Sequence, residues 1–335
     1  MEILGVPGDA PVVVTGGSGF IGRAVVRALR DTGRPVTVVD RVPYPEGDAG
    51  VKIVVGELGE ANVREAAVTP GVAAIVHLAG LTSVLKSVEM PMRTFADNVS
   101  VTQELLELAR IHGVPRFVFA STNAVIGDVG TATITEDLPP RPLTPYGATK
   151  AAGEMLMSGY SGAYGMTTCA LRFSNVYGPG MSHKDSFVPR LMRAALAGTG
   201  VKVYGDGRQR RDLVHVDDVV QAILKACVTG YSGRAIVAAG HSVSVLELIE
   251  TVREVTGAPI PVEHVEAPAG EMPAVVVDVS HSAESIGYQP SVSLADGLAT
   301  AWEYFLDQHS LDQHSLDQHS LDQHESDQHG SAQRE

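Results

Sequence analysis

The hydrophobic residues of the first half of the chain follow two alternating patterns. Short runs of mostly β-branched residues are apolar at successive positions, which is typical of parallel strands covered on both faces. These runs lie at residues 11–16, 35–40, 51–57, 73–80 and 116–122. Stretches with helical spacing separate or follow them, at residues 22–33, 61–68, 94–113 and 146–165. This alternation predicts an α/β fold with a doubly wound parallel sheet.

The pattern loosens after about residue 175. Gly-rich segments at 177–186 and 204–212 alternate with helix candidates at 188–198 and 216–228. We expect these residues to form a smaller α/β part that covers the substrate and is interleaved with the sheet.

The C-terminal residues 306–335 repeat the unit LDQHS. On a helix, successive leucines of this repeat would advance about 140°, so no apolar stripe would form. The repeated histidines could bind a metal, but tails of such low complexity are usually inert. We therefore expect no metal site.

The composition excludes several classes of function. With 335 residues and 44% apolar content, the chain can bury a large core. The net charge is −14 and no basic stripe is present, so neither nucleic acid nor an anionic membrane is expected as a partner. No apolar run reaches about 18 residues and the N-terminus lacks a signal-like segment, which favours a cytoplasmic protein. Cys169 and Cys227 lie in apolar stretches, which predicts buried, reduced thiols.

A Gly-rich turn follows the first strand candidate. The segment TGGSGFIG places Gly16, Gly19 and Gly22 where a pyrophosphate can approach the N-terminus of the following helix. Such a turn by itself can be an ordinary strand–helix corner. Here, however, the second strand candidate ends in Asp40, whose carboxylate can accept both ribose hydroxyls of NAD. Asp40 would repel the 2′-phosphate of NADP, although the adjacent Arg41 leaves NADP as an alternative.

Tyr146 and Lys150 are four residues apart and therefore share one face of a helix. They could be an ordinary exposed pair. A phenol titrates at about 10, however, and a nearby ammonium, helped by a positively charged nicotinamide, would lower that pKa and favour the phenolate. Thr122 ends the fifth strand candidate and could relay a proton between a substrate hydroxyl and Tyr146. The three residues would meet at the carboxyl ends of the strands, where such sheets bind ligands.

Further motifs occur in order over residues 11–305, among them HLAG, RFSNVYGPG and GDGRQRRDLVHVDD. With these motifs the chain resembles the extended short-chain dehydrogenases/reductases, in particular the NAD-dependent nucleotide-sugar epimerase/dehydratase family. The resemblance implies a Rossmann-type NAD-binding domain over residues 1–174 and a smaller, interleaved sugar-nucleotide domain over residues 175–305. Residues 306–335 lie outside it. The resemblance also implies tightly held NAD and a homodimer formed through two helices.

The resemblance also assigns residues to both ligands. The residues that it gives to NAD are Gly16, Gly19, Phe20, Ile21, Asp40, Leu58, Ala79, Asn98, Tyr146 and Lys150. It places Tyr204 near the base and Asn175 elsewhere on the sugar nucleotide. It places the planar fork of Arg211 on the diphosphate, although Arg211 could instead pair with Asp212.

One part of the diphosphate site departs from the family pattern. Relatives often carry a second Arg just before a Gly–acid pair. In this chain the pair is Gly270–Glu271, which the resemblance places at the substrate, and Pro268 occupies the position of the Arg.

The segment STNAVIG at residues 121–127 carries no charge. In the 4,6-dehydratases that resemble this chain, Asp-Glu follows the catalytic Thr and eliminates water, and decarboxylating relatives keep a Glu there. This chain has Asn123 and Ala124 at these positions. A Thr–Tyr relay without such an acid can remove a hydride and a proton and return both. If the 4-keto sugar rotates in the site before the hydride returns, the result is epimerisation at C4.

We therefore expect an NAD-dependent UDP-sugar 4-epimerase, with Thr122, Tyr146 and Lys150 as its catalytic set. Ser83, Asn123 and Ser174 are expected to make the wall around the sugar polar, which favours UDP-glucuronate slightly over UDP-glucose.

A uronate carboxylate needs hydrogen-bond donors, and Ser174 is the first candidate. The alternatives to an epimerase are an NDP-sugar dehydratase or 4-ketoreductase of the same family, and a non-catalytic NAD-binding regulator. The intact catalytic set disfavours a regulator. The resemblance also suggests a role in antibiotic biosynthesis.

Overall fold

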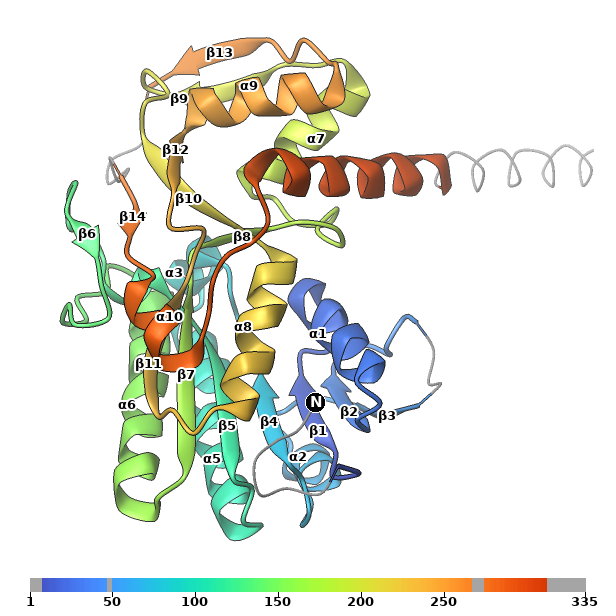
Figure 1. Ribbon diagram of the computed structural model, residues 1–335, viewed down its shortest axis with the longest axis vertical. Coiled ribbons are helices and arrows are strands. Elements are labelled where there is room, and N and C mark those ends of the chain that lie inside the picture. Colours follow the sequence, from blue (N-terminus) through green and yellow to red (C-terminus); the bar gives the residue numbers. More distant parts are fainter. Residues whose placement is uncertain (1–7, 47–49, 267–273, 312–335) are drawn as a thin grey trace, which may run out of the picture.

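In the computed structural model, which describes residues 8–46, 50–266 and 274–311, seven strands form a central sheet (Figure 1). Across the sheet they are β11 (Gly233–Val237), β7 (Thr167–Phe173), β5 (Arg116–Thr122), β4 (Ala74–His77), β1 (Val12–Thr15), β2 (Val36–Asp40) and β3 (Val51–Val55). All neighbouring strands are parallel, and the chain order changes direction between β1 and β4. The five strand candidates are confirmed as β1 to β5, and the doubly wound α/β class is confirmed with them.

Helices cover both faces of this sheet, which explains why the strands are apolar at successive positions. Val12 and Val14 pack into one hydrophobic cluster and Val13, between them, into another. The helices beside the sheet are α1 (Phe20–Asp31), α2 (Ala61–Ala67), α5 (Val101–Ile111), α6 (Pro145–Tyr164), α8 (Val216–Val228) and α10 (Ser280–Ile286). Residues of α1 and α8 belong to the first cluster, and residues of α2, α5 and α6 belong to the second.

The helix expected over residues 94–113 is present but contains an irregular turn. Here α4 (Pro91–Phe95), the π-helical turn η1 (Ala96–Ser100) and α5 follow one another without a loop. Single π turns inside helices are frequent at functional sites. A short helix before them, α3 (Val84–Glu89), was not predicted from the sequence.

A smaller group of elements lies beyond the carboxyl ends of the large sheet (Figure 1). It contains the strands β8 (Asn175–Tyr177), β10 (Arg210–His215), β12 (Ser242–Ser244), β9 (Val201–Tyr204) and β13 (Val262–Val265) and the helices α7 (Phe187–Ala197) and α9 (Val245–Thr256). The first three strands form one sheet, and β9 pairs with β13. Because α8 and β11 return to the large sheet, the two parts are interleaved. The domain boundary at residue 175 stays a prediction.

The remaining elements are short or terminal. A two-stranded pair joins β6 (Thr133–Ile134) to β14 (Val276–Val277), and a final helix spans residues 294–311. Leu306 and Leu311, which begin the repeats in this helix, are exposed.

None of the helices in the described ranges is long and apolar enough for a membrane span, and the same ranges hold no cluster of metal-ligating side chains. Both cysteine thiols are buried and free, as predicted.

The strands β7 and β11 were not predicted, and for β7 the reason is a buried charge. Arg172 interrupts its apolar sequence but is fully buried in the sheet. Its guanidinium forms a two-pronged ion pair with Glu154 of α6, with Nε–Oε1 and Nη2–Oε2 distances of 2.9 and 2.7 Å. Ser121, which is opposite Arg172 in the pairing of β5 with β7, donates to the same carboxylate at 2.6 Å. This network joins α6 to the two strands beneath it.

We predict that removing one partner of this ion pair costs more than removing both. Arg172→Met or Glu154→Leu alone leaves a buried, uncompensated charge and should lower the free energy of unfolding by about 3–5 kcal/mol. The double variant leaves neither charge unpaired and should lose less than either single variant. Urea unfolding followed by circular dichroism measures these differences. Arg110→Met, which breaks an exposed pair with Glu107, is the control and should change little. Losses that add in the double variant would contradict the prediction.

Candidate active site

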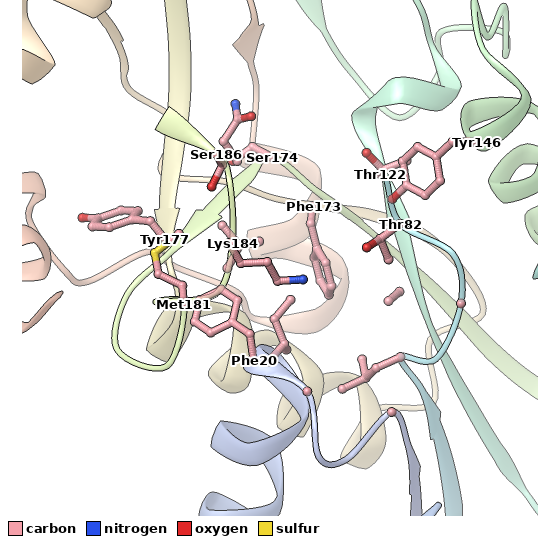
Figure 2. A pocket seen from close by; sticks show the side chains of 18 of the residues that line it. Phe20, Thr82, Thr122, Tyr146, Phe173, Ser174, Tyr177, Met181, Lys184 and Ser186 are labelled. Carbon is pink, nitrogen blue, oxygen red and sulfur yellow. The ribbon is translucent and has the colours of Figure 1, made fainter. Parts of the chain in front are cut away.

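A cavity of about 860 Å³ lies at the carboxyl ends of the parallel strands (Figure 2). Its lining combines the loops after β1 to β4 and the end of β5 with residues of β8, β9, β10 and the segment before α7. The predicted site residues that line it are Gly16, Gly19, Phe20, Ile21, Gly22, Asp40, Arg41, Leu58, Ala79, Thr122, Tyr146, Lys150, Ser174, Asn175, Tyr204 and Arg211. A volume of this size suits a small-molecule or cofactor site.

Three predicted site residues that the structure describes are not part of this lining. Ser83 caps α3, where its side chain accepts a hydrogen bond from the Lys86 amide. Asn98 and Asn123 are buried behind the cavity wall. Glu271 lies outside the described residues. Ser83, Asn98 and Asn123 were assigned by their positions along the chain, which do not define the direction of a side chain.

The Gly-rich turn is a close-packed corner that a side chain would disrupt. Gly16 has a φ angle of 70°, and a Cβ there would lie 2.9 Å from the Ala79 nitrogen at the end of β4. A Cβ on Gly22 would overlap the carbonyl oxygen of Gly16. The first turn of α1 contains no acidic side chain, so its free amide groups can receive an anion. This corner fits the diphosphate of a dinucleotide.

Asp40 is fixed at the end of β2 by backbone amides. Its Oδ2 accepts from the Ser18 amide at 3.0 Å and its Oδ1 from the Val42 amide at 3.4 Å. Each carboxylate oxygen keeps a lone pair for a ribose hydroxyl. Arg41 points to a different partner, Glu57, at 3.8 Å. The charge that faces the ribose position is therefore that of Asp40, which fits NAD better than NADP.

Thr122, Tyr146 and Lys150 meet at one end of the cavity. The Thr122 hydroxyl lies close enough to the Tyr146 phenol for hydrogen bonding to lower the pKa of Tyr146, and Figure 2 shows the two side chains facing each other. The start of α6 determines the position of Tyr146, because Thr144 accepts a hydrogen bond from the Gly147 amide at 3.2 Å and so caps the helix. Lys150 lies one turn further along and is buried, with its Nζ 4.5 Å from the centre of the Phe119 ring.

The side chains of the protein do not by themselves lower the pKa of Tyr146, although the spacing of Tyr146 and Lys150 had suggested that they would. Burial raises the pKa of Tyr146 to about 12, and the hydrogen bond from Thr122 opposes this shift only in part. Burial also lowers the pKa of Lys150 to about 8. Both shifts have the same cause, since desolvation disfavours the charged form of either group. The four-residue spacing of Tyr146 and Lys150 indicates the neighbouring charge but not the desolvation.

Asn98, in the π-helical turn, holds the loop after β4 against α6. Its Oδ1 accepts from the Leu81 amide at 2.7 Å, while its Nδ2 donates to the Leu81 carbonyl at 3.1 Å and to Thr149 at 3.0 Å. These bonds occupy the amide with protein partners. The geometry therefore supports a role in positioning the cavity wall rather than the direct NAD contact that the resemblance implied.

Ser174 is engaged in a way that the sequence did not indicate. Its hydroxyl donates to the Asp212 carboxylate at 2.6 Å, and Asp212 is fully buried. A hydroxyl has one proton, so Ser174 presents acceptor lone pairs to the cavity. Donation from Ser174 to a uronate carboxylate would require this hydrogen bond to break, and it stays a prediction. Asn175 donates to the Asp212 backbone carbonyl at 2.9 Å.

The wall behind Thr122 contains an unusual amide. Both side-chain polar atoms of Asn123 are buried and have no hydrogen-bond partner among the described residues.

The remaining polar residues of the lining come from the smaller part of the molecule. Arg211 donates to the Arg210 carbonyl at 2.8 Å, and Tyr204 lies exposed at the cavity rim. Lys184, in the Gly-rich segment before α7, also lines the cavity and was not predicted. Its signal in the sequence was a single lysine in an irregular loop.

Comparison with known proteins identifies relatives along most of the chain. The model of the NAD dependent epimerase/dehydratase family matches residues 12–239. The chain is 35% identical to dTDP-glucose 4,6-dehydratase of Streptomyces griseus over 308 residues, which cover 87% of this chain and 93% of that protein. It is 29% identical to UDP-glucose 4-epimerase of Corynebacterium glutamicum over 316 residues, which cover 88% of this chain and 95% of that protein.

Solved structures are similar along the same length. The structure of MoeE5 in complex with UDP-glucuronic acid and NAD has a TM-score of 0.82 and 35% identity, and covers 89% of this chain and 99% of MoeE5. MoeE5 in complex with UDP-glucose and NAD has a TM-score of 0.81 and 37% identity, with coverage of 90% and 99%. The shared fold extends over both parts of the molecule.

The depressed pKa of Lys150 predicts a pH-dependent difference in stability. The unfolded lysine titrates at 10.5 and the folded one at about 8, so the unfolded state binds more protons between these values. Relative to Lys150→Met, the wild type should therefore gain up to about 3 kcal/mol of stability as the pH rises through this window. Urea unfolding of both proteins at several pH values measures the difference. Parallel stability curves would show that Lys150 keeps its ordinary pKa.

Proposed function

The chain belongs to the NAD dependent epimerase/dehydratase family, and we propose that it is a UDP-sugar 4-epimerase. The relatives include dehydratases as well as 4-epimerases, so overall similarity does not decide the reaction. The side chains at the sugar end of the cavity are the better guide.

The absence of carboxylates around Thr122 and Tyr146 is the observation that carries the proposal. Among the described residues that line the cavity, the acids are Asp40, Glu57 and Asp97. Arg93 pairs with both Glu57 and Asp97, at 3.5 and 2.8 Å, so one guanidinium compensates both carboxylates. Asp40 ends β2, which β1 and β4 separate from β5 in the sheet. Elimination of water requires an acid or base near the sugar, and the described lining provides none there.

The proposed reaction uses the residues that do meet at the sugar end. Tyr146 takes the proton of the C4 hydroxyl and returns it, and Thr122 orients that hydroxyl through its hydrogen bond with Tyr146. NAD, when bound, takes up and returns a hydride and adds the positive charge that favours the phenolate of Tyr146. Lys150 adds a buried ammonium on the same helix face. If the 4-keto sugar rotates in the site between the two hydride transfers, the product has the inverted configuration at C4.

UDP-glucuronate and UDP-glucose are the two substrates that we propose to test first. MoeE5 has been solved in complex with each of them. The preference for the uronate has less support than the sequence suggested, because the Ser174 proton is committed to Asp212. A role in antibiotic biosynthesis stays a prediction.

The alternatives to an epimerase are enzymes that differ in the step after sugar oxidation, and a protein that binds NAD without catalysis. A 4,6-dehydratase is supported by the identity to the Streptomyces griseus protein and opposed by the uncharged Asn123 and Ala124. A 4-ketoreductase would consume reduced cofactor in stoichiometric amounts. A non-catalytic regulator would not require the hydrogen-bonded Thr122–Tyr146 pair above a buried Lys150.

We also propose that the protein is a homodimer through the surface of α3, α4 and α6. Leu85, Met92 and Met155, on these three helices, are 77%, 78% and 52% exposed. Nearby exposed apolar side chains are Val88, Phe95 and Leu143. Each of α3 and α4 packs against α6, so these exposed side chains lie on neighbouring helices. Apolar patches of this kind mark interaction sites, and a twofold axis would let the patch cover its own copy.

We predict that Tyr146→Phe lowers kcat for epimerisation by at least about a hundredfold, which is the usual contribution of a general acid–base group. The affinity for UDP should stay nearly unchanged, because the cavity keeps its shape. Product analysis by NMR with UDP-glucose and UDP-glucuronate, together with calorimetric titration of UDP, tests both statements. Wild-type protein that yields a 4-keto-6-deoxy sugar would make it a dehydratase, and near-normal turnover of the variant would exclude Tyr146 as the base.

The dimer surface predicts a second result. A double substitution of Met92 and Phe95 by Asp should convert the dimer into a monomer, since a buried, unpaired carboxylate is costly at an interface. Size-exclusion chromatography with light scattering gives the molar mass. Leu311→Asp, an equally conspicuous change on the final helix, is the control and should leave the mass unchanged. A wild type that is already monomeric would disprove the proposed interface.

A further inference from the structure

The cavity wall contains a lysine whose charge is not compensated by the protein. Lys184 lies in the segment between β8 and α7 and lines the cavity. Figure 2 shows its ammonium end pointing toward the space between Phe20 and Phe173. In the part of the chain that the structure describes, the ammonium makes no ion pair or hydrogen bond. Burial lowers the pKa of Lys184, as expected for a cation removed from water without a partner.

The groups around Lys184 increase this excess of positive charge. His183 has its pKa lowered by burial and then by the charges of Lys184 and Arg23, so the three basic groups lie near one another. The acid in the same segment, Asp185, is engaged elsewhere. Arg190 binds it in a two-pronged ion pair at 2.8 and 2.7 Å, and Arg193 approaches it at 3.6 Å.

The backbone of this segment is held in place, so Lys184 does not have to be ordered by a ligand. Arg193 donates to the carbonyl groups of Ser182 and Lys184 at 2.9 and 3.0 Å. Arg23 of α1 donates to the Gly180 carbonyl at 3.1 Å. The Lys184 amide donates to the Met181 carbonyl at 2.9 Å. A cation that is positioned in advance loses little conformational entropy when it binds an anion.

Two features indicate which anion it binds. The diphosphate of NAD has its own site at the Gly-rich turn and the N-terminus of α1, whereas Lys184 lies two residues before Ser186, the N-cap of α7, and the first residues of α7 also line the cavity. The predicted cation for the second diphosphate is Arg211, and one guanidinium does not neutralise a diphosphate. Phe173, which is opposite Thr122 in the pairing of β5 with β7, lies between Lys184 and the catalytic pair in Figure 2.

We propose that Lys184 binds the diphosphate of the sugar nucleotide and acts there as the second cation beside Arg211. The inference rests on the proposed function only in taking a UDP-sugar as the ligand. It assigns Lys184 to the part of the ligand that all UDP-sugars share, so Lys184 contributes affinity and does not select the sugar.

The test is a comparison of UDP with uridine as calorimetric ligands of the full-length, NAD-loaded protein. Lys184→Met keeps the length and the apolar stem of the side chain but removes its charge. This variant should weaken UDP binding by roughly ten- to a hundredfold, the range expected for a hydrogen bond to a charged group, and leave uridine binding unchanged. Lys184→Arg should restore most of the UDP affinity. Lys52→Met, a change at an exposed lysine outside the cavity, should behave as wild type.

Four results would overturn the inference. These are UDP affinity that survives Lys184→Met, an equal loss of uridine affinity, a loss restricted to UDP-glucuronate, and loss of bound NAD with normal UDP affinity. The last result would assign Lys184 to the dinucleotide instead. Failure of the proposed function is a separate outcome, because a protein that binds UDP through Lys184 but epimerises no UDP-sugar would retain the inference and lose the activity.

Discussion

One buried face of α6 connects the stability of this molecule to its chemistry. Tyr146, Lys150 and Glu154 are spaced four residues apart and therefore lie on the same face of the helix. Tyr146 reaches the cavity, Lys150 is buried in its wall, and Glu154 pairs with Arg172 in the sheet below. Each group would be costly to bury alone. Their burial is tolerated because the ion pair fixes the helix on β5 and β7, the two strands that carry Thr122 and Phe173.

The parts of the fold that local patterns determine could be predicted from the sequence. Continuous apolar runs located β1 to β5, because strands covered on both faces have no polar side. The same rule failed for β7, since Arg172 breaks the run and its partner Glu154 is 18 residues away in the chain. The Gly-rich turn and the Tyr–Lys spacing are likewise local features, and the structure brings those residues together in one cavity.

The properties of the site that depend on tertiary contacts could not be predicted in this way. The Ser174 hydroxyl appeared free to donate, but its acceptor, Asp212, comes from β10 on a different sheet. The pKa of Tyr146 was expected to fall because a cation is nearby, whereas the degree of burial, which no spacing reveals, raises it. Lys184 carries no motif, and its significance depends on Arg190 and Arg193 occupying the neighbouring acid.

The distribution of charge along the cavity explains why overall similarity to relatives does not identify the reaction. The Gly-rich turn and Asp40 serve a dinucleotide that both reaction types require, and basic groups such as Arg211 suit any nucleoside diphosphate. Most of the lining therefore distinguishes neither a dehydratase from an epimerase nor one sugar nucleotide from another. The two reactions differ in whether an acid lies beside Thr122, and in this chain the two positions that follow it are Asn123 and Ala124. Two uncharged side chains at the end of β5 therefore carry more information about the reaction than the identity shared along the remaining chain.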